Sequence, residues 1–505
     1  MLLIGATVWV FGHVPSGFVP QQDKQYLVAF AKLPDASSLD RTEAVIRRMT
    51  DIGLKHPAVA ESVAFPGLSI NGFTNSPSEG IAFFGLKDFK DRKSPETQLY
   101  ATVGALNGQF SSIQDAFVMV FPPPAVEGLG TIGGFRLQIE DRSNAGFAAL
   151  AGALGASIGR AYQTPELAGV FSSYTINVPQ VFADVDREKA KRMGLNLGDI
   201  FDTLQINLGS VYVNDFNRFG RTYQVVVQAD APYRVDPDQI GSLKMRSPGG
   251  NMIQLSSVLR TQASFGPDRV QRYNGYVTAE INGGPAPGFS SGQAQGAIEK
   301  ILKETLPKGF AFEWTDLTYQ EILAGNTMIY VFPLCVLLAF LVLAAQYESF
   351  SLPLAVILIV PMCVLFAVTG VWLTVGESTV VQKLLGLIGV HLPSGDNNIF
   401  TQIAFIVLVG LACKNAILIV EFARDVQRTG KSAREVALEA CRLRLRPILM
   451  TSFAFIMGVT PLILGGGAGS EMRQAIGVAV FSGMLGVTLF GLFLTPVFYV
   501  LLQSG

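Results

Sequence analysis

The chain has 505 residues, of which 49% are hydrophobic and 15% carry a charge. This balance lies on the apolar side of ordinary soluble proteins, so a purely cytosolic globular enzyme is not expected. The 38 basic residues against 39 acidic ones give a formal net charge of -1. Such a charge leaves no broad basic surface for a nucleic acid.

Cysteine and histidine usage excludes two further classes of protein. The cysteines all follow residue 334, at Cys335, Cys363, Cys413 and Cys441. A disulfide framework or a Cys-rich metal site is therefore excluded before that point. The histidines lie far apart in sequence, at His13, His56 and His391. We predict no metal ion and no cofactor.

Apolar residues are unevenly distributed along the chain. From about Asp23 to Gln320, charges recur every few residues, and short strand patterns alternate with helical patterns such as Arg41–Lys55 and Asp186–Leu195. About 300 residues of this kind are enough for two to four small soluble domains.

Long apolar runs dominate the chain after Gly325. A bilayer core of about 30 Å needs about 20 apolar residues per helix. We predict transmembrane helices at residues 326–346, 352–375, 399–421, 447–465 and 474–502. Residues 1–11 are also apolar but would cover only about half a bilayer, so we interpret them as the end of a truncated transmembrane helix. A signal peptide is the alternative, but this segment has no Lys or Arg and no Ala-x-Ala sequence after it.

Basic residues predict the orientation of these helices. Residues 424–446, between the third and fourth spans, carry seven Lys and Arg against three Asp and Glu, which predicts a cytoplasmic location. The turn at residues 347–351 is then cytoplasmic too, and the soluble region and the link at residues 376–398 lie on the opposite, periplasmic face. Apolar residues at helical spacing predict an amphipathic helix at residues 431–446 that lies on the membrane surface.

Lys414 is the most unusual residue of the predicted spans. It lies about ten residues from the cytoplasmic end of the third span, where a charged group costs about 2.5–3.5 kcal/mol on insertion scales. Such a Lys is a functional candidate that faces a partner acid or a water-filled cavity. The alternative is a side chain that reaches the interface, which is difficult from this depth.

Three other polar residues near the cytoplasmic side have simpler interpretations. Glu421 shares a face with Lys414, but it is close enough to the interface to be a solvated helix-end group. Arg444 and Thr451 share a face of the next span. An Arg there is ordinarily an anchor, and a Thr in a membrane helix usually bonds its own backbone. No predicted span contains a deep Asp, so we expect the partner of Lys414 on a helix outside this chain.

Several stretches spread over the chain form a more specific pattern. They are Phe18–Lys24 (FVPQQDK), Val211–Phe216 (VYVNDF) with Arg218 and Gly220–Arg221 after it, Arg272–Gly275 (RYNG), Leu341–Pro353 (LVLAAQYESFSLP), Gly410–Asp425 (GLACKNAILIVEFARD) and Arg442–Phe455 (RLRLRPILMTSFAF). Together they resemble the resistance-nodulation-division (RND) multidrug efflux permeases, in the hydrophobe/amphiphile branch of the AcrB type. Such permeases have two similar halves, and this chain is similar to the second, C-terminal half.

The resemblance implies a fold. It is a membrane α-helical bundle of five full spans plus the end of a sixth, with a large periplasmic α+β porter region of split βαβ subdomains and a docking subdomain. The porter subdomains are expected over residues 12–174, the docking (funnel) subdomain over residues 175–270, and a return to the second porter subdomain over residues 271–320.

The resemblance also implies a function and partners. It implies a homotrimeric proton/drug antiporter of the bacterial inner membrane that exports hydrophobic drugs and detergents. A periplasmic membrane-fusion adaptor protein and an outer-membrane channel complete the pump. The N-terminal half of the permease carries paired Asp residues that face a Lys, which corresponds to Lys414 here. The family's relay Arg and Thr correspond to Arg444 and Thr451. An enzyme is not expected, because the sequence has no phosphate-binding loop and no Gly-x-Ser-x-Gly motif.

Phe residues line the family's drug pocket, beside a switch loop that corresponds to Pro66–Pro77. The drug-binding residues predicted on this basis are Phe83, Phe65, Leu68, Ile70, Phe73 and Phe121. Without the resemblance, such aromatics on sheet faces would be interpreted as core. The loop differs from the AcrB pattern in length and has fewer aromatics, and Phe171 stands in place of a family entrance Arg.

A second hypothesis belongs to another class of function. A truncated or split gene product could fold its periplasmic part and serve only as a non-transporting assembly partner, and composition does not separate the two. Other RND branches export metal ions, but the spans contain no Met or carboxylate triplet for such a cargo.

Overall fold

The computed structural model describes residues 2–70, 73–325, 327–375, 383, 395–428, 430 and 432–503. The predicted link at residues 376–398 lies mostly outside the described residues. The chain forms two compact units. One comprises Met1–Ser173 with Gln271–Gly505, and the other comprises Tyr174–Val270.

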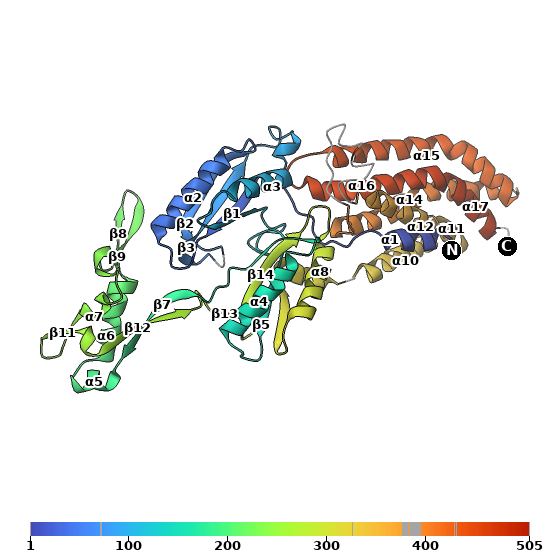
Figure 1. Ribbon diagram of the computed structural model, residues 1–505. Helices are drawn as coiled ribbons and strands as arrows, with labels where there is room; N and C mark the ends of the chain where they lie inside the picture. Colours follow the sequence, from blue (N-terminus) through green and yellow to red (C-terminus); the bar gives the residue numbers. More distant parts are fainter. Residues whose placement is uncertain are drawn as a thin grey trace. The chain divides into compact units, whose positions relative to one another are not determined.

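The first unit contains a four-stranded antiparallel sheet in the order β2-β3-β1-β4. Its strands are β1 (Tyr26–Lys32), β2 (Val59–Leu68), β3 (Asn75–Leu86) and β4 (Phe117–Phe121). Helices α2 (Leu39–Leu54) and α3 (Leu99–Phe110) cover one face of this sheet (Figure 1). Ser38 caps α2 by accepting a hydrogen bond from the Arg41 amide. The order β-α-β-β-α-β is that of a split βαβ unit.

A second sheet in the same unit has the order β13-β14-β5-β15, with β6 paired to β14. Its strands are β5 (Phe135–Asp141), β6 (Leu167–Phe171), β13 (Gln271–Tyr273), β14 (Tyr276–Pro285) and β15 (Phe310–Thr315). Helices α4 (Phe147–Ala161) and α8 (Ser291–Thr305) pack against it (Figure 1). Gly134, with a φ of +113°, is required beside β14, because a Cβ there would lie 2.2 Å from the Gly283 carbonyl oxygen.

The second unit is inserted between β6 and β13. Strands β7 (Val178–Val185) and β12 (Leu259–Gly266) pair near the two ends of the inserted segment, and β8 (Val211–Arg218) with β9 (Arg221–Val227) form a hairpin. The smaller elements are α5 (Arg187–Arg192), α6 (Leu197–Leu204), α7 (Gln239–Ser242), β10 (Lys244–Arg246) and β11 (Met252–Gln254). A core of its own includes the fully buried Ile200 and Leu255.

Five stretches in the described part of the chain are long and apolar enough to span a membrane. They are α10 (Met328–Tyr347), α11 (Ser351–Ile357) with α12 (Val360–Trp372), α14 (Ile399–Gln427), α15 (Ala433–Leu464), and α16 (Ser470–Gly486) continued through the π-helix η5 (Val487–Gly491) into α17 (Leu492–Gln503). The prediction of five spans is confirmed, and α1 (Leu2–Phe11) is helical as well.

The fourth span corrects one prediction. The sequence predicted a separate surface helix at residues 431–446, but α15 runs from Ala433 to Leu464 without a break. Ser432 starts it with a capping box to Glu435. At about 1.5 Å per residue the helix is about 48 Å long, more than the bilayer core needs. The basic segment is therefore continuous with the fourth span and does not form a separate helix.

Proline interrupts two of the other spans. Pro361 has no amide hydrogen and its ring crowds the carbonyl four residues earlier, at Ile357, where α11 ends. Pro496 has the same relation to Leu492, where η5 passes into α17. The two interruptions meet in the core of the bundle, where Ile359 and Leu492 line the same small cavity.

Glycines on α12 and α16 allow these helices to approach closely. A Cβ at Gly370 would lie 1.9 Å from the Ser482 hydroxyl, and a Cβ at Gly486 would lie 2.2 Å from the Phe366 ring. A Cβ at Gly483 would lie 2.6 Å from the side chain of Leu408 on α14. Small residues of this kind are what membrane helices use for tight packing.

Candidate functional site

The membrane part of the candidate site centres on Lys414, in the middle of α14. Its side chain is exposed on the surface of the bundle, whereas its neighbours Cys413 and Asn415 are buried. Among the described residues, no acidic side chain forms an ion pair with Lys414. Glu421, on the same helix, is instead 3.9 Å from Arg424. The residues that the structure describes thus leave a membrane-embedded ammonium without a counter-ion.

A buried hydrogen bond beside Lys414 holds α14 against α15. The Asn415 Nδ2 donates to the Ser452 hydroxyl over 3.0 Å, and only 7% of Asn415 and 1% of Ser452 is exposed. An amide in hydrocarbon needs such a partner, because no water is present to replace it. This bond therefore defines the register between the two helices.

The register places Lys414 and Thr451 on the same side of the helix pair. Lys414 immediately precedes Asn415, and Thr451 immediately precedes Ser452. One residue back along an α-helix turns the side chain by about 100° around the helix axis. Because α14 and α15 are consecutive helices that run in opposite directions, the two rotations turn toward the same side. Both side chains are exposed there, and the Thr451 hydroxyl donates to the Ile448 carbonyl over 3.0 Å.

Arg444 lies two turns before Thr451 and is partly buried. Its guanidinium carbon is 4.9 Å from the centroid of the Phe422 ring on α14, a cation–π contact. Its buried Nε has no hydrogen-bond partner within the described residues. The structure does not bring Arg444 into contact with Lys414. The three predicted relay residues thus occupy one pair of helices but form no direct network of their own.

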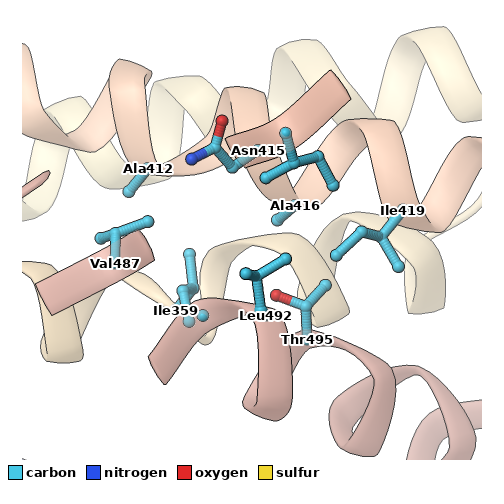
Figure 2. Close-up of a pocket in the computed structure, with 10 residues that line it drawn as sticks. Ile359, Ala412, Asn415, Ala416, Ile419, Val487, Leu492 and Thr495 are labelled. Carbon is cyan, nitrogen blue, oxygen red and sulfur yellow. The ribbon is translucent and has the colours of Figure 1, made fainter. Parts of the chain in front are cut away.

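The small cavity behind this pair is apolar. It is lined by Ile359, Ala412, Asn415, Ala416, Ile419, Ile448, Val487, Gly491, Leu492 and Thr495 (Figure 2). It has room for little more than one water molecule, so it is too small for a drug-sized ligand. The cavity lies beside Asn415 and is also lined by Val487 and Gly491 of the π-helix.

The chain enters α14 through a partly buried acid, Asp396. Asn398 caps the helix by accepting a hydrogen bond from the Thr401 amide at 2.9 Å, and its own Nδ2 donates to Asp396 over 2.7 Å. Burial raises the pKa of Asp396 to about 6, against the opposing effect of that hydrogen bond.

The second part of the candidate site is an apolar cluster on the face of the first sheet that α2 and α3 leave open. Side chains alternate across a strand, so Leu27 and Ala29 pack under the helices while Val28 and Phe30 point to the other face. The members of this cluster are Val28, Phe30, Ile70, Ile81, Phe121 and Phe171, with Tyr26, Leu68, Phe83, Met119 and Ile132 packed against them.

Four of the six predicted drug-binding residues belong to this cluster: Phe83, Leu68, Ile70 and Phe121. Phe65 adjoins it, because its ring meets that of Phe83 edge-on with the centroids 6.1 Å apart. Phe73 does not join the cluster and is 52% exposed. Much of the predicted switch loop at Pro66–Pro77 is strand, since β2 ends at Leu68 and β3 begins at Asn75.

Sequence reasoning did not predict that Phe171 belongs to this cluster. Phe171, at the end of β6 in the second sheet, stacks on Phe30 with centroids 4.8 Å apart and on Phe121 at 5.3 Å. The local signal in the sequence was the alternation of Val28 and Phe30 with Leu27 and Ala29 along β1. The stacking of Phe171 on Phe30 and Phe121 joins two sheets, and such a tertiary contact leaves no local pattern in the sequence.

Comparison with known proteins places this geometry in a family. The chain matches the AcrB/AcrD/AcrF family over residues 1–503. It belongs to that family. It is 37% identical to a toluene efflux pump membrane transporter, TtgB of Pseudomonas putida, over the whole chain and 46% of that protein. It is also 37% identical to the multidrug export protein AcrF of Escherichia coli, over 99% of the chain and 47% of that protein. With the multidrug resistance protein MdtF of Escherichia coli the identity is 36%, over the whole chain and 47% of that protein.

These matches confirm the resemblance to RND multidrug efflux permeases. The five apolar spans and the relatives, all membrane transporters, make this an integral membrane protein, and the inner membrane is the location consistent with such permeases. The chain spans about half the length of the curated relatives that it matches.

Proposed function

We propose that this chain is the C-terminal half of an inner-membrane proton/drug antiporter that exports hydrophobic and amphiphilic compounds. The observation that carries the proposal is Lys414. A membrane-embedded Lys that is exposed and has no acidic partner among the described residues calls for a carboxylate on a neighbouring helix. The N-terminal half of the permease, with its paired Asp residues, is the proposed source.

In this mechanism the ammonium of Lys414 responds to the charge of those carboxylates. When they are ionised, the ammonium is attracted to them; when they take up protons, the attraction is lost and the helices can rearrange. Thr451 faces the same side of the α14–α15 pair, and Arg444 lies two turns nearer the start of α15. We propose that both contribute to the path of the proton.

The test is Lys414→Ala in the complete permease, with the N-terminal half present. We expect proton-driven efflux to be abolished while the protein still folds, and Lys414→Arg to be weak, because a planar guanidinium differs from a compact ammonium in shape and donor geometry. Lys300→Ala, at an exposed position on α8, is the control and keeps full efflux. Full efflux by Lys414→Ala would show that Lys414 is structural. Efflux by the 505-residue chain alone would show that no acidic partner from another half is needed.

We further propose how the soluble parts serve transport. Residues 12–174 and 271–320 are assigned to the porter subdomains, and residues 175–270 to the docking subdomain. Support comes from the two split βαβ units and from the compact inserted unit with its own core. On this proposal a homotrimer, a periplasmic adaptor protein and an outer-membrane channel form the complete pump.

We propose that the apolar cluster contacts drugs through its partly exposed members Phe83 and Leu68, with Phe65 beside them. Aromatic side chains supply a large, non-directional contact area that different substrates can share. Phe83→Ala is expected to weaken the free energy of drug binding by about 1 kcal/mol, which is about a fivefold loss in affinity for bulky apolar drugs. Phe265→Ala, at a 70% exposed position, is the control. Unchanged susceptibility of Phe83→Ala cells across a broad drug panel, at equal expression, would contradict the assignment.

A further inference from the structure

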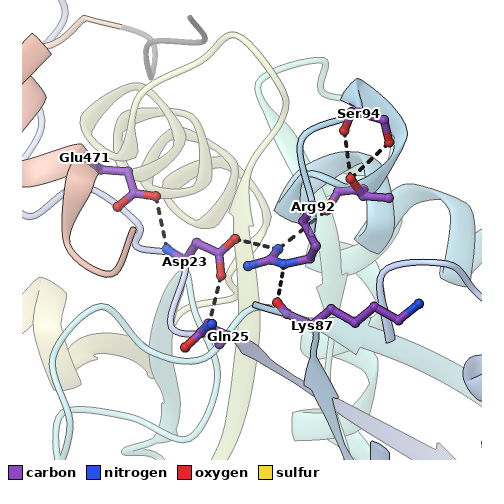
Figure 3. Close-up of polar contacts among 7 residues, drawn as sticks. Asp23, Gln25, Lys87, Arg92, Ser94 and Glu471 are labelled. Atoms are coloured by element: carbon purple, nitrogen blue, oxygen red, sulfur yellow. Dashed lines mark hydrogen bonds and ion pairs between the residues drawn. The ribbon is translucent and has the colours of Figure 1, made fainter. Parts of the chain in front are cut away.

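A buried ion-pair network joins the first turn of α16 to the first sheet (Figure 3). The Asp23 amide donates to Glu471 Oε1 over 3.1 Å, and the Asp23 carboxylate pairs with Arg92 Nη1 at 2.8 Å. Glu471 begins a membrane helix, Asp23 lies three residues before β1, and Arg92 lies between β3 and α3. The network thus connects segments that are far apart in sequence.

The sheet side of this network is rigid. Only 2% of the Arg92 side chain and 12% of the Asp23 side chain are exposed. Arg92 Nε also donates to the Lys87 carbonyl over 2.8 Å, and the guanidinium lies 5.0 Å from the centroid of the Phe89 ring. Asp23 accepts a second hydrogen bond from the Gln25 amide at 2.9 Å. A buried pair with this many constraints cannot rotate without losing several contacts.

A second contact runs beside the first. Gln22 Nε2 lies 3.4 Å from both the Met472 sulfur and the Ala125 carbonyl. Consecutive residues before β1 therefore hold consecutive residues of α16. If the start of α16 moves, the segment that leads into β1 therefore has to move with it.

The network is not the most stable way to pack the end of a helix. Glu471 Oε2 and Arg92 Nη2 are buried without a hydrogen-bond partner among the described residues, and leaving buried polar atoms unpaired costs stability. Apolar residues of similar size would pack such a contact at least as stably. The polar arrangement therefore favours a role beyond holding the fold together.

Both ends of the network lead toward the proposed sites. On the membrane side, α16 packs tightly on α14 where Gly483 meets Leu408, and α14 carries Lys414. On the sheet side, β1 carries Phe30 and pairs with β3. In this pairing Val28 of β1 lies opposite Phe83 of β3. Close-packed helices and strands transmit displacements because they have little free volume.

We propose that Glu471, through Asp23 and Arg92, couples movement of the membrane helices to the sheet that carries the drug-contacting cluster. This rests on the proposed function, since it links the proton relay to the cluster. Glu471 is a positioning residue in this scheme and touches neither proton path nor drug.

The test compares Glu471 variants of the complete permease in proteoliposomes under a pH gradient, with a cationic fluorescent dye as substrate. Glu471→Ala is expected to lower dye transported per proton about fivefold or more, the lower end of typical coupling between sites, with dye binding and proton influx retained. Glu471→Gln keeps an acceptor for the Asp23 amide and is expected to transport nearly normally. Should Glu471→Ala not fold, Glu471→Asp, which keeps the charge but shortens the reach, is expected to show the same loss. Arg473→Ala is the control. It changes a charge in the same turn, but its side chain bonds the Gly466 and Ala468 carbonyls instead.

Two results would overturn the coupling role. One is a wild-type ratio of dye to protons in Glu471→Ala. The other is a loss of dye binding that Arg473→Ala shares, which would indicate a structural role. Lys414→Ala, measured in parallel, separates this proposal from the proposed function. If Lys414→Ala still transports, the proton relay is misassigned; if it fails as expected while Glu471→Ala transports normally, only the coupling is refuted.

Discussion

The hydrogen bond between Asn415 and Ser452 offers a quantitative test of how the membrane site is built. Ser452→Ala removes the acceptor and leaves the buried Asn415 amide unpaired, whereas Asn415→Leu removes the donor. Asn415 and Ser452 are 7% and 1% exposed, and their bonded atoms are 3.0 Å apart, so bulk solvent has little access to the unpaired amide.

The expected magnitude follows from the environment. Interhelical hydrogen bonds in membranes contribute about 0.6 kcal/mol on average and about 1.7 at most, and an unpaired buried amide adds about 1–3 kcal/mol. We therefore expect Ser452→Ala to lower the free energy of unfolding by about 1–2 kcal/mol. The double variant should lose less than the sum of the single variants, by about 0.6–1.7 kcal/mol.

Unfolding in mixed micelles with increasing SDS, followed by circular dichroism, measures these energies for the four proteins of the cycle. Thr460→Ala is the matched control on α15. Its hydroxyl bonds only the Ile456 carbonyl of its own helix, at 3.0 Å, so a small effect is expected. Efflux should fall with the coupling energy, since the bond orients the adjacent Lys414 and Thr451. Additive losses in the cycle, or full efflux in all variants, would refute the claim that this bond defines the register.

Two further predictions concern packing and pH. Gly370→Val should lower stability by about 1–3 kcal/mol, an overpacking cost, because its Cβ would lie 1.9 Å from the Ser482 hydroxyl. SDS unfolding checks this against Gly458→Val, where no atom lies within 4 Å of the new Cβ, and equal losses would contradict it. Burial raises the pKa of Asp396 from 3.8 to about 6, so its charge opposes folding and stability falls as the pH rises from about 4 to about 6. Asp396→Asn should therefore stabilise the protein at pH ~8 by up to about 3 kcal/mol, about two pKa units at about 1.4 each, and hardly at pH ~4. A gain of the same size at both pH values would refute this.

Hydropathy along the chain was enough to establish the membrane character of this protein. A bilayer sets a minimum length for every spanning helix, so local hydropathy was sufficient to find five spans. It also singled out Lys414 as a charged group within an apolar span. Motifs such as Gly410–Asp425 were specific enough to identify the family, because they are contiguous in the chain. Period-two patterns in the soluble region likewise predicted strands.

Which of these residues lie together became apparent only in the folded chain. Local patterns did not show that α15 continues through Pro447, because a Pro ends some helices and only bends others according to what packs around it. No periodicity relates Asn415 to Ser452, Phe30 to Phe171, or Asp23 to Arg92 and Glu471. Each of these contacts joins segments far apart in sequence, and its energy depends on burial that exists only after the chain has folded. The position of Lys414 along its helix was therefore readable from the sequence, whereas the face that it shares with Thr451 and the connection of α16 to the first sheet were not.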